Sequence, residues 1–306
     1  MHRLVRVGIG IGLLLNGCTT VYPRYVVSVP VLDVRAQPGP LAEPASHDPL
    51  QETQLVYGEV VQVERIEQGW ALIEALEQRE YTHHNRWQGY PGWVLADLLQ
   101  PLRREAPTPN AVITTRWATV WRDEWATKPL LQLPLGTKIT VLDPRRVFWT
   151  IQLGSGQQGW LAHGAGELLT TVRRLPPAQR RQAIVTAASQ LLGDPYFWGG
   201  RSPAAGSSHL GATGVDCSGL VNLAYRAVGM DIPRDAHEQF LLSRKVLTVN
   251  PADLLFLSSP EDREKIVHVM LYAGDGWLIE GPGTGSVVRR IRVKERLGSD
   301  LDTLHP

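Results

Sequence analysis

The most informative segment of the chain reads Gly214-Val215-Asp216-Cys217-Ser218-Gly219-Leu220-Val221. Cys217 is the only cysteine outside the extreme N-terminus. It lies where a glycine-rich loop is followed by a helix-forming run that reaches Val228. A thiol at a helix N-terminus faces unpaired backbone N–H groups and the positive end of the helix dipole, and both favour the nucleophilic thiolate. A single cysteine is more often an inert buried residue, but this setting favours a nucleophile.

A cysteine nucleophile needs a base within hydrogen-bonding reach and a third group that orients the base. His268 is the strongest candidate base because its strand, residues 266–272, is otherwise apolar. A polar side chain in a buried strand carries a desolvation cost and usually has a reason to be there. Turn signals at 274–276 predict a hairpin whose second strand ends at Glu280, which could accept the imidazole N–H. The alternative for His268 is a structural core histidine bonded to backbone, and the alternative for Glu280 is a solvated glutamate at the strand end.

The chain divides into three regions. Residues 26–102 show short alternating strands separated by turns, and residues 110–170 weakly repeat the same order of strands and Gly-Trp motifs. This order resembles bacterial SH3-like domains occurring twice, which implies two small all-β barrels; an unrelated β-rich domain is the alternative. Residues 175–306 place helices before strands, so the predicted fold is α+β, with papain-like packing of helices on an antiparallel sheet.

The third region resembles the NlpC-type cysteine peptidases, papain-like bacterial enzymes that cut cell-wall peptides. The resemblance rests on four segments: 195–200, 214–219, 232–239 and 268–274. It implies that Cys217 is the nucleophile, His268 the base, Glu280 the orienting group and Tyr196 a support for the oxyanion site.

Two departures from the family pattern stand out. The orienting residue of this family is usually His, Asn or Gln, and here it is Glu280. The long stretch 201–213 precedes the nucleophile and is either a rim or lid or a passive loop.

The order of the three regions resembles a subgroup that cuts γ-D-glutamyl–diaminoacyl bonds in murein peptides with a free N-terminal L-Ala. In that subgroup the first barrel closes one end of the groove, and an acidic pocket holds the amine. Ala236 stands where the subgroup commonly has Ser, so one pocket hydrogen bond is missing or rearranged. For Glu59 and Tyr90, which lie in the first barrel, an ordinary structural role in the barrel is the alternative. The resemblance assigns these residues to substrate binding: Glu59, Tyr90, Trp198, Asp216, Ser218 and Asp235.

The N-terminus is predicted to be an export signal, because positive charge precedes a short apolar run. Leu15-Asn16-Gly17-Cys18 resembles a lipobox, which implies a signal peptide at 1–17 and lipidation of Cys18. Thr19 favours transfer to the outer membrane, so we expect an exported protein anchored on its periplasmic side. An ordinary cleaved signal is the alternative.

Composition narrows the remaining possibilities. A net charge of +1 predicts no nucleic-acid partner. His83-His84 lacks spaced partners, so we expect neither a metal site nor a cofactor. The favoured function is endopeptidase action on murein peptides. An inactive peptidase-like lipoprotein that binds these peptides, and an endopeptidase of peptide cross-links, remain the alternatives.

Overall fold

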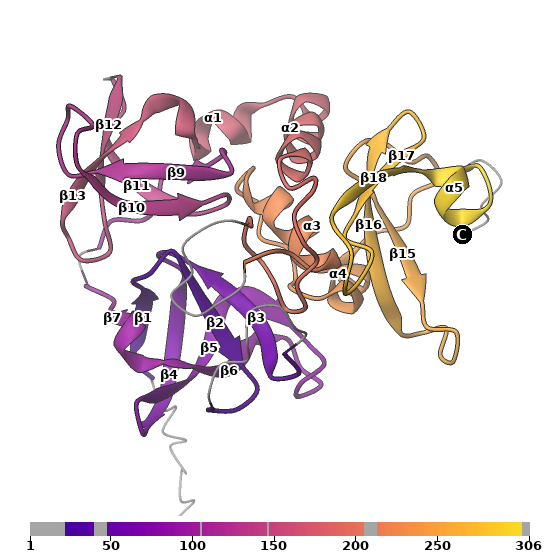
Figure 1. Ribbon diagram of the computed structural model, residues 1–306, viewed down its shortest axis with the longest axis horizontal. Coiled ribbons are helices and arrows are strands. Elements are labelled where there is room, and N and C mark those ends of the chain that lie inside the picture. The colour runs from indigo at the N-terminus through magenta and orange to yellow at the C-terminus, as the bar shows by residue number, and fades with distance from the viewer. Residues whose placement is uncertain (1–21, 40–47, 105, 146, 205–212, 302–306) are drawn as a thin grey trace, which may run out of the picture.

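The computed structural model describes residues 22–39, 48–104, 106–145, 147–204 and 213–301. The predicted signal peptide and Cys18 lie outside the described residues, as does most of the 201–213 stretch. Two N-terminal sheets lie on one side of a group of helices, and a C-terminal sheet lies on the other (Figure 1). Among the described residues, no helix combines the length and the apolar composition needed to cross a membrane.

The first sheet is built from residues 24–101 and contains seven strands. Its strands are β1 (Arg24–Val27), β2 (Val31–Arg35), β3 (Gln51–Val56), β4 (Val60–Glu67), β5 (Trp70–Glu80), β6 (Gln88–Leu95) and β7 (Leu99–Pro101), with the 3-10 helix η1 (Ala96–Leu98) before β7. They pair in the order β3-β2-β6-β5-β4-β1-β7. The all-β prediction is confirmed, but closure into a barrel is wrong, because β3 and β7 are unpaired edges of an open sheet.

The β3 edge is covered by the third region of the chain instead of by β7. The backbone N–H of Arg201 donates to the Gln54 side chain at 2.9 Å, and the Arg201 guanidinium donates to the Gln54 carbonyl at 3.2 Å. Edge-strand groups need partners when they are buried. The first sheet therefore stays open where it docks on the peptidase region.

The second sheet repeats the first strand for strand. Its order is β10-β9-β13-β12-β11-β8-β14, which is the first order with every number raised by seven. The weak internal repeat in the sequence therefore reflects a duplicated topology, again as an open sheet. Its elements are β8 (Ala111–Ile113), β9 (Trp117–Trp121), β10 (Pro129–Pro134), β11 (Lys138–Asp143), β12 (Phe148–Gln152), β13 (Gln158–Ala162), η2 (His163–Ala165) and β14 (Gly166–Leu168).

The third region has the predicted α+β order. Its helices precede a four-stranded antiparallel sheet, β15-β16-β17-β18, and α5 follows that sheet. Its elements are α1 (Leu169–Arg174), α2 (Pro177–Ser189), α3 (Cys217–Arg226), α4 (Ala236–Leu242), β15 (Leu254–Ser258), β16 (Ile266–Gly274), β17 (Trp277–Glu280), β18 (Arg289–Arg292) and α5 (Val293–Leu297).

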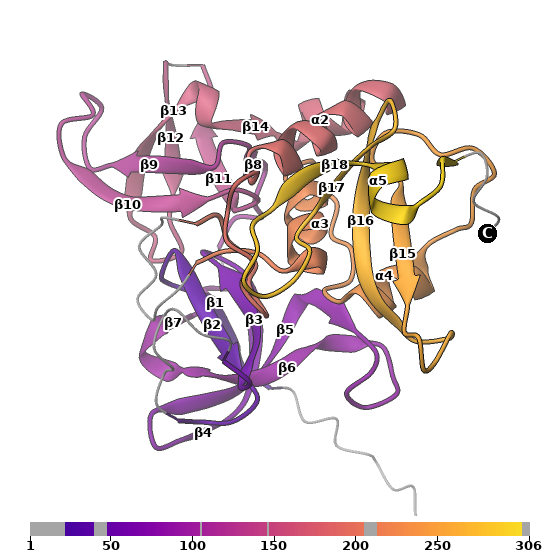
Figure 2. The same ribbon diagram turned by 45° about the vertical axis from the view of Figure 1, so that its right-hand side comes forward.

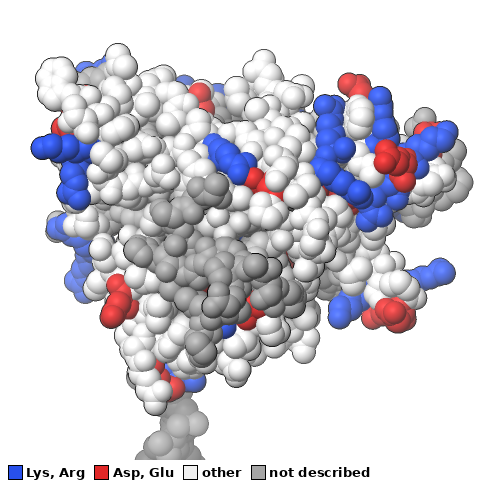
Figure 3. All heavy atoms as spheres, viewed as in Figure 1, with Lys and Arg blue, Asp and Glu red and all other residues white. Residues whose placement is uncertain are grey.

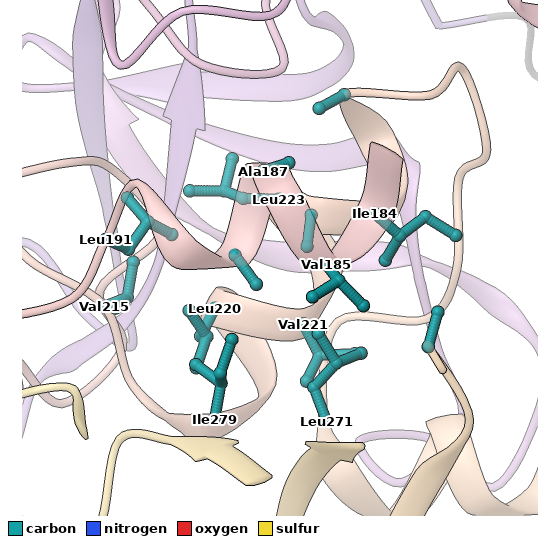
Figure 4. Packing of buried hydrophobic residues seen from close by; sticks show 14 of the residues in the cluster. Ile184, Val185, Ala187, Leu191, Val215, Leu220, Val221, Leu223, Leu271 and Ile279 are labelled. Carbon is teal, nitrogen blue, oxygen red and sulfur yellow. The ribbon is translucent and has the colours of Figure 1, made fainter. Parts of the chain in front are cut away.

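Helix α3 lies at the centre of the molecule, packed between α2 and the C-terminal sheet (Figures 1 and 2). Leu220 faces Ile279 of β17, and Val221 faces Leu271 of β16 (Figure 4). All four side chains are fully buried. Full burial of each such side chain contributes about 1.5–3 kcal/mol. This packing fixes the helix that begins at Cys217 against the strand that carries His268.

A buried ion network joins the first sheet to α3. Both oxygens of Glu59 accept from Arg201, at 2.9 and 3.1 Å, and Arg226 of α3 lies 3.2 Å from Glu59. Arg226 also binds Glu77 of β5 at 2.9 Å. We predicted that Glu59 would line a substrate pocket, but its side chain is 1% exposed and its charge is already matched by two guanidiniums. Its position is that of a docking residue between two domains.

Candidate active site

Cys217 is the first residue of α3, as the sequence predicts. Asp216 caps the helix, because its carboxylate accepts from the backbone N–H of Gly219 at 2.6 Å. Gly219 permits a close approach at this point, since a Cβ there would lie 2.1 Å from the carbonyl oxygen of Gly200. The sequence around the cysteine therefore suits a tightly packed loop-to-helix turn.

Arg234 joins the nucleophile segment to the first sheet. It is fully buried and donates to Asp216 at 2.8 and 3.1 Å, to Ser218 at 2.9 Å and to Thr53 of β3 at 2.6 Å. Asp216 and Ser218, which we predicted to bind substrate, are therefore already engaged by a buried arginine. They hold the loop around Cys217 through these bonds, and their binding of substrate stays a prediction.

The thiol of Cys217 is buried against β16. Burial raises the pKa of Cys217 to about 12, and the charge of Asp216 adds to this rise, while backbone hydrogen bonds from Val269 and Ser218 oppose it. Burial therefore outweighs both these hydrogen bonds and the charge of Arg234, so the neutral thiol is favoured. A cation closer to the sulfur would favour the thiolate. The contact with Val269 places the sulfur next to the residue that follows His268.

His268 lies on β16 and contacts Glu280 at the end of β17. Its Nε2 is 2.8 Å from Glu280 Oε2, and the predicted hairpin joins the two strands. Burial raises the pKa of Glu280, but hydrogen bonds from His268, Arg289 and Arg296 outweigh burial and lower it to about 2. The carboxylate is therefore ionised throughout the physiological range and orients the imidazole through Nε2, which leaves Nδ1 for a second partner.

Tyr196 lies close to the nucleophile. Burial raises its pKa, and the nearby Asp216 and Cys217 raise it further, so the phenol stays protonated and can donate a hydrogen bond. Trp198, two residues on, is 49% exposed, which suits a residue that lines a groove. The catalytic and binding roles of both residues stay predictions.

An acidic cluster forms where the first sheet meets the N-terminus of α4. The Tyr90 hydroxyl donates to Asp235 at 3.0 Å and lies 3.3 Å from Glu52 of β3. Burial raises the pKa of Asp235, and despite an opposing effect of Arg234 the value reaches about 7. Tyr90 and Asp235, both predicted to bind substrate, contact each other, and the carboxylate of the first sheet beside them is Glu52, not Glu59. Their role in binding stays a prediction.

Sequence reasoning missed Glu52 and its contact with His83. No motif marks Glu52, and it stands among other polar residues in Gln51-Glu52-Thr53-Gln54, so the sequence carries no signal for it. His83 lies 3.5 Å from Glu52 and 3.0 Å from Glu80 at the surface of the first sheet. The hydrogen bond to Glu52 is the main cause that raises the His83 pKa to about 9. Across the described part of the chain, no group of three His, Cys, Asp or Glu side chains has metal-binding geometry.

A thiol at a helix N-terminus, packed against a strand that carries a carboxylate-bound imidazole, defines the class of papain-like cysteine peptidases. Residues 193–300 match the model of the NlpC/P60 family. Residues 193–300 therefore form an NlpC/P60 domain of the cysteine-peptidase type.

Relatives and solved structures extend the likeness beyond the peptidase domain. The γ-D-glutamyl-L-lysine dipeptidyl-peptidase of Bacillus cereus is 27% identical over 240 residues, which cover 76% of this chain and 67% of the relative. The peptidoglycan endopeptidase RipB of Mycobacterium tuberculosis is 35% identical over 158 residues, 49% of this chain and 64% of the relative. The crystal structure of an NlpC/P60 family protein from Bacillus cereus covers 88% of this chain and 94% of its own length, with a TM-score of 0.70 and 21% identity. The fold of nearly the whole chain is therefore shared with that protein.

Proposed function

We propose that this protein hydrolyses cell-wall peptides, with Cys217 as nucleophile and His268 as its acid–base partner. The pairing of His268 with Glu280 beside the buried thiol carries the proposal. The imidazole takes the thiol proton, and the thiolate attacks the amide carbonyl. His268 then returns the proton to the leaving amine, and water releases the acyl-enzyme. The Cys217 backbone N–H and the Tyr196 hydroxyl stabilise the oxyanion.

The scissile bond we propose is the γ-D-glutamyl–diamino acid bond of peptides that begin with a free L-Ala. The relatives named as γ-D-glutamyl-L-lysine dipeptidyl-peptidases support this choice. The acidic cluster of Glu52, Tyr90 and Asp235 supports it independently, because an ammonium group needs carboxylates and acceptors in a confined place. Trp198 contributes to the wall of the groove.

Blocking the amine tests the bond assignment. We expect rapid cleavage of L-Ala-γ-D-Glu-diamino acid tripeptide, and about a tenfold to hundredfold lower kcat/KM for its N-acetyl form, because charge-assisted hydrogen bonds to the amine are lost. Mass spectrometry of the products, with a Cys217→Ala control, measures both rates. Equal rates for the two peptides, or preferential release of cross-linked dimers from intact sacculi, would replace this proposal with cross-link cleavage.

The ionisation of Asp235 predicts how amine recognition depends on pH. Because its pKa is about 7, the carboxylate becomes negative as pH rises through 7, whereas the substrate amine loses its charge near pH about 8. The ratio of kcat/KM for the free peptide to that for the acetylated peptide should therefore peak between these values. The ratio cancels the ionisations of the catalytic groups. Asp235→Asn should remove the rise on the acid side; an unchanged profile in that variant would exclude Asp235 from the pocket.

For the N-terminus, we propose that Cys18 is lipidated and anchors the enzyme on the periplasmic side of the outer membrane. The support is the sequence Leu15-Asn16-Gly17-Cys18. Metabolic labelling with an alkyne fatty acid, compared between wild type and Cys18→Ser, tests the modification. Label that persists in Cys18→Ser would contradict the assignment.

A further inference from the structure

Glu280 is clamped by two arginines that the catalytic scheme does not use. Arg289 donates to Oε1 from Nε and Nη2, at 3.1 and 2.7 Å. Arg296 Nε lies 2.9 Å from both carboxylate oxygens. Glu280 is fully buried, whereas the side chains of Arg289 and Arg296 are 44% and 26% exposed. A buried carboxylate is tolerated when its lone pairs and charge are matched, and these two arginines supply most of that match.

The register of β18 explains why one arginine reaches Glu280 while its neighbour does not. Arg289 is paired directly opposite Glu280 in the β17–β18 ladder. Side chains alternate along a strand, so Arg290 points to the other face, where its guanidinium lies 4.7 Å from the Trp277 ring. Arg296 comes from α5, immediately after β18. Lys and Arg side chains gather over β17, β18 and α5 (Figure 3), and among the described residues of this basic surface Arg289 and Arg296 are the ones that contact Glu280.

The two arginines contact the two carboxylate oxygens of Glu280 differently. Arg289 occupies only Oε1, so Oε2 faces His268 Nε2 and shares only Arg296 with the other oxygen. We propose that Arg289 and Arg296 are positioning residues: they hold Glu280 with Oε2 towards His268 and, through Glu280, set the pH range in which the imidazole is charged. This inference rests on the proposed function, because it takes His268 as the acid–base group.

The sign of the effect follows from the charges around the pair. Glu280 is contacted by His268 from β16, Arg289 from β18 and Arg296 from α5. On the same strand, the Cys217 thiol of α3 contacts the Val269 backbone, and His237 of α4 accepts from the Ile266 N–H. Each guanidinium offsets part of the negative charge that Glu280 presents to the imidazole. Removing one guanidinium leaves the carboxylate more negative and stabilises imidazolium, so the imidazole should lose its proton at higher pH.

The test uses the full chain with Arg289→Gln or Arg296→Gln, and with Arg290→Gln as the matched control from the same strand. In a Cys217→Ala background, NMR follows the His268 imidazole signals as pH is varied. We expect the titration midpoint to rise by about half to one pH unit in each clamp variant, and by less than about 0.2 in the control. With Cys217 intact, the alkaline limb of kcat/KM should move by a similar amount. Arg296→Lys, which keeps the charge, should bring the midpoint most of the way back to the wild-type value.

A double-variant cycle separates action through Glu280 from a general charge effect. In a Glu280→Gln background, Arg289→Gln should shift the midpoint by less than half as much as it does alone. Arg289→Gln is the safer variant for folding, since Arg289 is the more exposed of the two and Arg296 still contacts both carboxylate oxygens. Midpoints equal to the Arg290→Gln control, or the same shift with and without Glu280, would overturn the inference. A shifted midpoint in a protein that cleaves no peptide would instead support the positioning role of Arg289 and Arg296 and overturn the proposed function.

Discussion

Replacement of Cys217 with alanine is expected to lower peptide hydrolysis roughly ten-thousandfold or more, because no acyl-enzyme can form without the thiol. The substitution removes one buried atom from a packed turn, so the fold should persist. Single-turnover measurements on the free-amine tripeptide give the rate, and thermal unfolding checks the fold. Cleavage at the wild-type rate by a folded Cys217→Ala protein would show that another group performs the attack.

The reactivity of the same thiol gives a second measure of its partnership with His268. Because burial raises the pKa of Cys217 to about 12, an isolated thiol would be almost wholly protonated at pH 7. Alkylation by iodoacetamide near neutral pH, in a Cys18→Ser background, should therefore slow at least about tenfold in His268→Gln, since the imidazolium is lost. His237→Gln is the matched control: its ring accepts from the Ile266 N–H at 3.3 Å at the start of the same strand. Equal alkylation rates in the two variants would separate His268 from the thiol.

Local patterns in the sequence were sufficient for the parts of the site that depend on neighbouring residues. The helix that begins at Cys217 followed from a glycine-rich loop before an apolar run, and the contact between His268 and Glu280 followed from strand alternation and a tight turn. In both cases the deciding interactions lie within about a dozen residues of the chain.

Contacts between distant parts of the chain could not be predicted in the same way. Glu59 and Arg201 are 142 residues apart, and Arg234 reaches Thr53 across 181 residues. No periodicity marks such pairs, so Glu59 was assigned to the pocket and Glu52 was missed. For the same reason the sequence did not predict that the first sheet stays open, because its β3 edge is covered by the peptidase region. The sequence also did not predict the burial of the Cys217 thiol, which depends on how β16 packs over α3.

The ion network around Glu59 yields the largest expected effect on stability. Glu59→Ala would leave Arg201, which is fully buried, without its carboxylate. Removing one partner of a buried ion pair typically costs about 3–5 kcal/mol, because the remaining charge is desolvated and unmatched. Arg226 is less affected, since Glu77 and Asp231 still bind it. We therefore expect a loss of this size in the free energy of unfolding, measured by urea denaturation.

The control is Glu67→Ala, which removes an ion pair with Arg65 in which both side chains are more than half exposed. Such a pair contributes about 0–1 kcal/mol. If Glu59→Ala is no less stable than Glu67→Ala, the network does not hold the first sheet in place. Adding Arg201→Met to Glu59→Ala should recover part of the loss, because the uncompensated charge is removed. Since Glu52 and Tyr90 lie on this sheet and Asp235 on the peptidase domain, loosening the network should raise KM for the free-amine peptide more than for its acetylated form.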